Sequence, residues 1–179
     1  MTLYRKIGEL GPRVLGKDTL FKWGFNLSPM YRRSTARIID VDPDLSQIRI
    51  RLPLSYRNRN YVGSIFGGSM FSAVDPIPMV QLINILGPDY VVWDKSAQVD
   101  FKVPAKEDLY ASFDYGTEEV EDIKRRVAEE GELTFVKTTR LTNRDGSLTF
   151  CEVRKTVFVA SKAHYRAKKK RRSGSAGAG

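Results

Sequence analysis

The sequence is short of the two side chains that most often bind metals or act as nucleophiles. Its 179 residues include one histidine, His164, and one cysteine, Cys151. A lone cysteine excludes an internal disulfide and suits a reducing compartment, so we expect a cytoplasmic protein. His164 lies at the edge of a basic segment, where a solvated surface position is the expected role. We therefore predict no metal site, no Cys–His or Ser–His pair and no cofactor.

Positive charge is concentrated at the end of the chain. The net charge is +9, but residues 162–179 contain seven Lys or Arg residues and no acid, and subtracting these seven leaves +2 for residues 1–161. Because residues 162–179 have little apolar surface to bury, we expect them to form a disordered basic tail. Such a tail is able to contact anionic surfaces, but the charge distribution does not predict a nucleic-acid-binding protein.

Hydrophobic periodicity predicts a mixture of helices and strands. Two short helices are expected in an N-terminal extension at residues 1–33, with apolar faces formed by Leu3, Ile7 and Leu10 and by Leu20, Trp23 and Leu27. Alternating apolar and polar residues predict strands at 36–41, 47–54, 97–103, 109–115, 133–142 and 148–160, and a short helix carries Val120, Ile123 and Val127. Because hairpins join these strands, we expect one α+β domain at residues 34–161 with a mainly antiparallel sheet.

A long apolar helix is predicted in the middle of the chain. From Tyr61 to Pro88 the only charged side chain is Asp75, and Met70–Leu86 is apolar nearly all round, which is typical of a fully buried helix. A transmembrane helix is the alternative. Asp75, Pro76 and Pro78 count against it, since an Asp at the membrane centre costs about 3 kcal/mol on insertion scales. We expect the sheet to wrap around this helix.

The segment from Asn60 to Asp75 is the candidate functional centre. Gly67 and Gly68 precede the apolar helix, where exposed backbone N–H groups and the helix dipole can hold a developing oxyanion. They do not form a nucleotide-binding motif. Asp75 is a single carboxylate on an apolar helix, a type of group that is concentrated at functional sites. Structural alternatives stay open: a tight turn for the two glycines, and a cap for the helix that resumes after Pro76.

The run from Phe66 to Asp75 resembles the signature of hotdog-fold acyl-CoA thioesterases of the phenylacetate-pathway type. That signature is His-Gly-Gly with an Asp nine residues after the His. Asn60 and Gly63 match residues that lead into it, and the Asp100–Ala105 segment resembles a family strand that ends in Phe-x-x-Pro-Ala. The resemblance covers roughly residues 34–161. It is closest to an uncharacterised branch, domain of unknown function 4442, which carries Asp-Pro after the motif and a Trp-Asp-Lys, here Trp93-Asp94-Lys95.

This resemblance implies the hotdog fold, an antiparallel sheet wrapped around a long central helix, and hydrolysis of an acyl-CoA or acyl-carrier thioester. Backbone amides of Gly67 and Gly68 would polarise the thioester carbonyl, and Asp75 would act as general base or nucleophile, with Asn60 positioning water or the carboxylate. The expected substrate contacts are Phe66, Ser69, Arg57, Arg59 and Lys95, of which the last three would face CoA phosphates. Phe66 replaces the family's histidine and cannot hydrogen-bond, so a non-catalytic acyl-CoA or lipid-binding protein is the alternative.

The spacing of Gly67 and Asp75 bears on assembly. They are eight residues apart, which is about 12 Å along a helix with a rise of 1.5 Å per residue. One thioester group cannot contact both, so the two must come from different subunits if both act. We therefore expect a homodimer, or a dimer of dimers, with shared sites.

Overall fold

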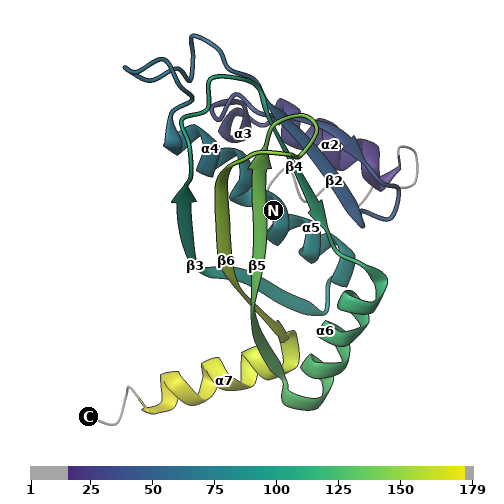
Figure 1. The fold of residues 1–179 in the computed structure, drawn as a ribbon. Helices are drawn as coiled ribbons and strands as arrows, with labels where there is room; N and C mark the ends of the chain where they lie inside the picture. The colour runs from purple at the N-terminus through teal and green to yellow at the C-terminus, as the bar shows by residue number, and fades with distance from the viewer. Residues whose placement is uncertain (1–15, 176–179) are drawn as a thin grey trace.

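A computed structural model of the chain describes residues 16–175, with side chains as far as residue 171 (Figure 1). Its strands are β1 (Arg37–Val41), β2 (Gln47–Leu52), β3 (Tyr90–Phe101), β4 (Leu109–Asp114), β5 (Glu132–Thr142) and β6 (Thr149–Ser161). Its helices are α2 (Lys17–Leu27), α3 (Pro29–Arg32), α4 (Gly67–Val74), α5 (Pro76–Leu86), α6 (Thr117–Glu130) and α7 (Lys162–Ser175). The helix predicted over Leu3, Ile7 and Leu10 lies outside the described residues.

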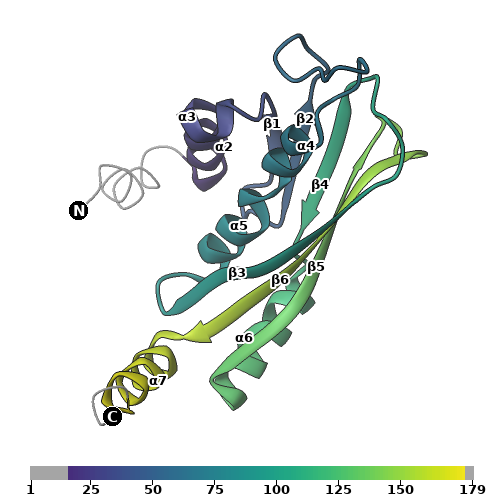
Figure 2. The same ribbon diagram turned by 90° about the vertical axis from the view of Figure 1, so that its left-hand side faces the viewer.

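The six strands form one sheet in the order β1-β2-β4-β5-β6-β3, and every pairing is antiparallel, as predicted. The sheet curves around α4 and α5, which run along its inner face (Figures 1 and 2). Alternation along β4 shows why: Leu109, Ala111 and Phe113 are buried, whereas the residues between them are more exposed. This is the arrangement that the resemblance to hotdog proteins implies.

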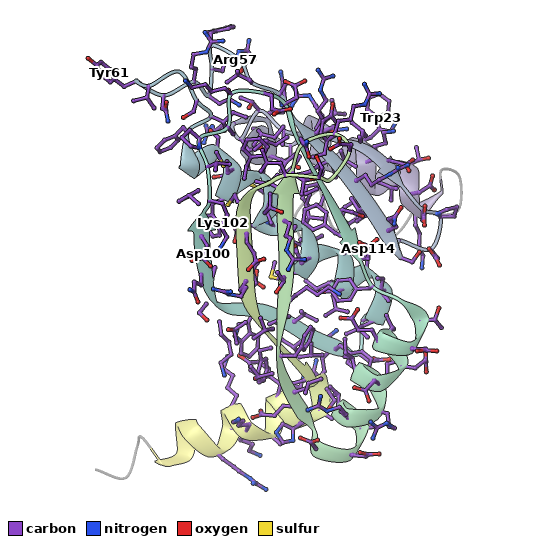
Figure 3. All side chains as sticks on the ribbon, viewed as in Figure 1. Trp23, Arg57, Tyr61, Asp100, Lys102 and Asp114 are labelled. Atoms are coloured by element: carbon purple, nitrogen blue, oxygen red, sulfur yellow. The ribbon has the colours of Figure 1, made fainter. Side chains whose placement is uncertain are left out.

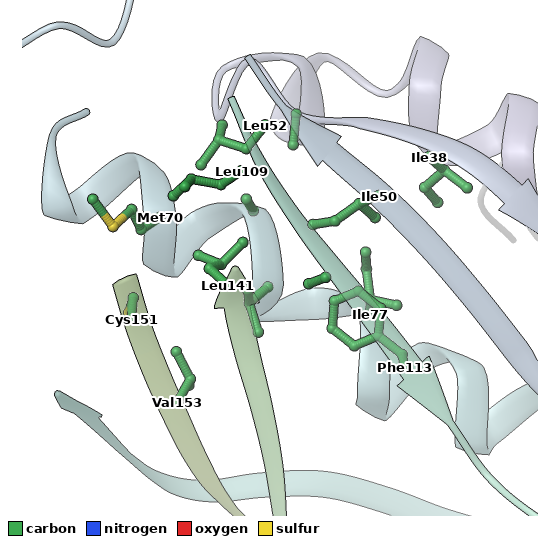
Figure 4. Packing of buried hydrophobic residues seen from close by; sticks show 14 of the residues in the cluster. Ile38, Ile50, Leu52, Met70, Ile77, Leu109, Phe113, Leu141, Cys151 and Val153 are labelled. Atoms are coloured by element: carbon green, nitrogen blue, oxygen red, sulfur yellow. The ribbon is translucent and has the colours of Figure 1, made fainter. Parts of the chain in front are cut away.

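The buried side chains of α4 and of the start of α5 form one cluster with the inner face of the sheet, whereas the later residues of α5 belong to a second cluster with β3, β5, β6 and α6. Figure 4 shows Met70 and Ile77 of these helices among strand residues such as Ile50, Leu109 and Leu141. The stretch Gly67–Leu86 is long and apolar enough to cross a membrane by length and composition alone, but 50% of its most apolar window is buried inside the fold. One side of it packs in the core, as predicted, but full burial was wrong, because the sheet covers only one side and the stretch is divided into α4 and α5 at Asp75.

The N-terminal helix buries a different face from the one predicted. Phe21 of α2 is buried, whereas Trp23 and Leu27, which were expected to pack inward, are 58% and 63% exposed. The reason is aromatic packing, because Phe21 stacks on Phe25 with ring centroids 4.7 Å apart, and Phe25 meets Tyr31 edge-on. Trp23 lies on the outer surface (Figure 3).

Strand β3 also differs from the prediction. It begins at Tyr90, earlier than expected, and ends at Phe101. Its apolar residues Ala97 and Phe101 are exposed rather than buried. The physical reason is its position at the edge of the sheet, where it pairs with β6 alone among the described strands.

The segment predicted to be a disordered tail is helical from Lys162 to Ser175. Helix α7 follows β6 directly and leaves the body of the molecule at the end opposite to α3 and α4 (Figures 1 and 2). Contacts with the sheet explain its order: the ring of Tyr165 packs against Trp93, and Lys168 Nζ lies 2.6 Å from Glu132 Oε1. The segment itself has too few apolar residues to predict an ordered helix. The residues that hold it in place, Trp93 and Glu132, lie elsewhere in the chain.

Candidate functional site

A cleft runs along the outer side of α4, the side that the sheet does not cover. It has a volume of about 530 Å³ and is lined by residues of α3 and the segment after it, of α4 with its two caps, and of the start of α5, namely Met30, Arg33, Ser34, Phe66, Gly68, Ser69, Phe71, Ser72, Asp75 and Pro76. Four of the residues predicted for the site, Phe66, Gly68, Ser69 and Asp75, therefore share one cleft. Phe66 and Asp75 are the N-cap and the C-cap of α4 and are therefore separated by the length of that helix.

The N-terminus of α4 has free backbone donors, of which Gly68 lines the cleft and Gly67 lies just outside its lining. Phe66 is the N-cap in extended conformation, with Gly67 and Gly68 as the first two helical residues. The amides of Gly67 and Gly68 have no acceptor in a turn, loop or cap of the described chain, as expected for the first turn of a helix. The helix begins where the sequence predicts, and its two leading N–H groups remain available to an anionic or polarised oxygen.

Two aromatic rings lie close to these glycines. A Cβ atom at Gly67 would lie 2.7 Å from Phe101 Cζ, and one at Gly68 would lie 2.3 Å from Phe66 Cε1. Both rings belong to side chains that are more than half exposed. The two glycines are thus closely packed against these rings, and this packing exists together with the free amides.

Asp75 closes α4 and is followed by Pro76, the first residue of α5, with its own backbone helical at φ −48° and ψ −52°. Its side chain is 46% exposed and lines the cleft. Although it is the one charged residue in its part of the sequence, it is not isolated in space. Lys155 Nζ lies 2.9 Å from Asp75 Oδ1 and also donates to the Asp75 carbonyl oxygen. Capping offers no alternative role for it, because Asp75 makes no side-chain cap hydrogen bond to α5.

Lys155 is the residue of this region that the sequence analysis missed. It lies on β6 with 1% exposure, and it forms a further ion pair with Asp94 of β3. A signal for it exists in the sequence, since Val153, Lys155 and Val157 all lie on the inner face of one alternating strand. A lysine at a core position of a strand is rarely fully buried unless it is paired.

Other residues predicted for the site lie outside the cleft lining. The Asn60 side chain holds a turn: its Oδ1 accepts from the amides of Val62 and Ser64, and its Nδ2 donates to Ser64 Oγ. Arg57 lies with Tyr61 on a loop that projects from the body (Figure 3), and Arg57 Nε donates to the neighbouring Tyr56 hydroxyl.

Arg59 pairs its backbone with Ile65 in an isolated bridge. Lys95 lies on β3 above the ring of Phe158, 5.7 Å from its centroid.

Polar groups deeper in the fold complete the surroundings of Lys155. Asp94 Oδ1 and the Tyr115 hydroxyl are buried and have no hydrogen-bond partner among the described residues. Burial raises the pKa of Tyr115 well above its usual range, and the negative charges of Glu119 and Asp94 raise it further. Among residues 16–175 no group of His, Cys, Asp and Glu has the arrangement of a metal site.

Comparison with known proteins places this geometry in context. Residues 17–159 match the family model described as domain of unknown function (DUF4442). No curated protein matches the chain. A crystal structure of a protein from Pseudomonas aeruginosa, described as a probable thioesterase, is similar over 79% of this chain and 94% of that chain, with a TM-score of 0.69 and 21% identity.

Two further solved structures are described as thioesterases. The protein from Haemophilus influenzae is similar over 77% of this chain and 87% of that chain, with a TM-score of 0.56 and 13% identity. The protein from Staphylococcus aureus, a point mutant, is similar over 74% of this chain and 99% of that chain, with a TM-score of 0.53 and 12% identity. At these identities the likeness shows a shared fold.

Proposed function

The chain belongs to the family defined by domain of unknown function DUF4442 and has the hotdog fold, and from this starting point we propose that it hydrolyses an acyl-CoA or acyl-carrier thioester. One observation carries the proposal. The free amides of Gly67 and Gly68 lie at the N-terminus of α4, where Gly68 lines the cleft, and the exposed carboxylate of Asp75 lines the same cleft at the opposite end of the helix, within reach of a second chain packed there. Amide donors and a carboxylate are the groups that hydrolysis of a thioester requires.

In this mechanism the N–H groups of Gly67 and Gly68 donate to the thioester carbonyl oxygen as it becomes an oxyanion. Asp75 removes a proton from water, whose oxygen attacks the carbonyl carbon. The C–S bond then breaks, and the leaving thiolate takes the proton from Asp75, which gives the free acid and the thiol. Phe66 and Ser69 line the cleft beside the amides and contact the substrate. Removal of one oxyanion donor typically costs on the order of 100-fold to 1,000-fold in kcat.

The proposed site is shared between two subunits. Gly67 and Asp75 lie at opposite ends of the same helix, about 12 Å apart at 1.5 Å per residue, so one thioester cannot contact both within one chain. The exposed side of α4 supports this arrangement, because a second chain packed there would bring its own Asp75 toward Gly67. A homodimer is the smallest assembly that fits, and a dimer of dimers is compatible with it.

A non-catalytic acyl-CoA-binding protein is the second candidate, and Phe66 favours it. The side chain at this position is 58% exposed at the cleft and offers neither a proton nor a hydrogen bond. A protein of this kind would bind acyl-CoA without releasing thiol.

The deciding experiment measures thiol release from a panel of short-chain to long-chain acyl-CoA substrates. We expect hydrolysis by the wild-type chain and its loss in Asp75→Asn, with Asp89→Asn as the matched control because Asp89 is an exposed turn residue outside the cleft. Hydrolysis that survives in Asp75→Asn contradicts the mechanism. Thermal stabilisation by an acyl-CoA without thiol release identifies the binding protein instead.

A second pair of variants isolates the amide. Gly67→Ala and Gly67→Pro both displace the ring of Phe101, but only proline removes the N–H, at a helix position that tolerates it. We expect Gly67→Pro to lose activity and Gly67→Ala to keep most of it.

Mixing Gly67→Pro with Asp75→Asn subunits tests the shared site. Hybrid dimers then carry one intact site, and about one quarter of all sites regain activity. No recovery on mixing, under conditions where subunits exchange, would show that the two groups act within one chain.

A further inference from the structure

We propose that Lys155 is the positioning residue of the site, fixing the Asp75 carboxylate at the cleft while Asp94 holds Lys155 in place. This inference rests on the proposed hydrolytic role of Asp75. It assigns a function to two residues on strands β6 and β3, far in the sequence from the Phe66–Asp75 motif.

The first support is that every hydrogen-bond donor of the Lys155 ammonium group has an acceptor. An ammonium group has three N–H donors, and Lys155 Nζ has three acceptors: the Asp75 carbonyl oxygen, Asp75 Oδ1 and Asp94 Oδ2. The residue is buried between Val153 and Val157 of the same strand face. Because all three donors are used, the position of the buried ammonium group and the orientation of its N–H bonds are both fixed.

The second support is the way in which Asp75 is held. Lys155 contacts both the main chain and the side chain of Asp75, so it fixes the end of α4 and the orientation of the carboxylate together. Within the described chain no donor reaches the other carboxylate oxygen, Oδ2, and the side chain is 46% exposed toward the cleft. One oxygen is thus anchored and the other is free, as a general base requires.

The third support is the charge balance. Lys155 paired with Asp75 alone would neutralise the carboxylate that has to accept a proton. Asp94 shares the ammonium, so the three groups together keep one negative charge. Asp94 is only 21% exposed, and among the described residues no donor reaches its Oδ1. Its negative charge therefore acts mainly on Lys155, which leaves Asp75 less neutralised than it would be in a simple pair.

A merely structural ion pair is the competing explanation, and a charge-matched variant separates the two. Lys155→Met/Asp94→Asn removes one positive and one negative charge from the core and leaves Asp75 unchanged. Each single variant is expected to lower the denaturation midpoint, and the double variant is expected to recover part of the loss relative to Lys155→Met. A purely structural pair then predicts recovery of activity as well.

Positioning predicts a different result. We expect the double variant to bind a non-hydrolysable acyl-CoA thioether like the wild-type chain but to have a kcat lower by on the order of 100-fold, the usual effect of a small misplacement. Adding Asp75→Asn to the double variant should cost little more, because the carboxylate is already out of place. Retention of the wild-type kcat in the double variant overturns the inference. If this variant does not fold, Asp94→Asn alone serves, with a reduced kcat expected and an unchanged kcat overturning the inference.

Failure of the proposed hydrolytic function can be distinguished from failure of the positioning role of Lys155. If the wild-type chain releases no thiol from any acyl-CoA, the hydrolytic role falls, and the positioning role is measured in crystal structures instead. Movement of the Asp75 side chain away from its wild-type place in the double variant supports the inference. An Asp75 side chain that stays in place without Lys155 overturns it.

Discussion

The ring of Tyr165 stands edge-on against the indole of Trp93, with centroids 5.3 Å apart. This contact, together with Glu132, which faces both Lys168 and His164, joins helix α7 to the sheet. This aromatic contact and the Glu132 carboxylate therefore help to hold the first turns of the basic helix against the sheet.

Acid is expected to loosen α7. The hydrogen bond from Lys168 lowers the pKa of Glu132 below its ordinary 4.5, and the charge of His164 adds to this effect. Because the folded-state pKa is depressed, the stabilisation is present above pH 4.5 and is lost as the pH falls through the folded value. Trp93 fluorescence in a Trp23→Phe background should report a transition below pH 4.5. Glu132→Gln should abolish it, and an unchanged transition in that variant would refute the assignment.

Asn60 is expected to act through the turn that it holds. Asn60→Ala removes the acceptor used by the amides of Val62 and Ser64 and should lower the free energy of unfolding by about 1–2 kcal/mol. Asn60→Asp keeps that acceptor and loses the amide N–H. Chemical denaturation and kcat are measured for both variants. Near-normal turnover in Asn60→Asp identifies a structural residue, whereas a large loss in kcat with unchanged stability identifies a positioning one.

Phe66→His tests whether the vacant histidine role limits catalysis. The side chain at this position lines the cleft and is exposed, so the substitution should fold with little change in stability. A proton-transfer group typically contributes 100-fold or more, and we expect an increase in kcat of roughly tenfold for an imperfectly placed histidine. Phe66→Leu is the control, with no increase. Equal rates for the two variants would mean that the histidine role is filled by other groups or is not needed.

Cys151 is expected to be unreactive until the chain unfolds. Burial raises the pKa of its thiol to about 11 from an ordinary 9.0, with Asp100 and Glu152 adding to the effect. The raised pKa lowers the fraction of thiolate by about 100-fold, and burial keeps a disulfide reagent away from the sulfur. Both effects slow the reaction of the thiol with the reagent. Labelling in denaturant should therefore follow the unfolding curve, and Cys151→Ser should give no signal because it is the sole cysteine. Fast labelling of the native protein would contradict this prediction.

The sequence predicted those strands and helices whose buried face follows from the periodicity of their own residues. Alternation along residues 133–142 and 148–160 indicated β5 and β6 almost to the residue, since strand pairing buries one face of each. The apolar run likewise indicated the central helix. By contrast, the packing face of α2 was wrong because aromatic contacts of Phe21 decided it, and those contacts depend on Tyr31 and the sheet rather than on helical spacing.

The candidate site was predictable only in part for the same reason. Phe66, Gly68, Ser69 and Asp75 lie on one short segment, so a motif finds them together. Lys155 is 80 residues from Asp75 and 61 from Asp94, and only the antiparallel pairing of β3 with β6, beside α4, brings the three together. No periodicity within one element carries that information.

The ion cluster also constrains the order in which this protein can diverge. Lys155 has two carboxylate partners, so loss of either Asp75 or Asp94 still leaves the buried ammonium with one counter-charge. Loss of the lysine first would leave Asp94 facing the core unpaired, the costlier step. A lineage that loses the proposed hydrolytic activity is therefore expected to change a carboxylate first and the lysine last, so that a lysine at position 155 remains after the catalytic carboxylate is gone.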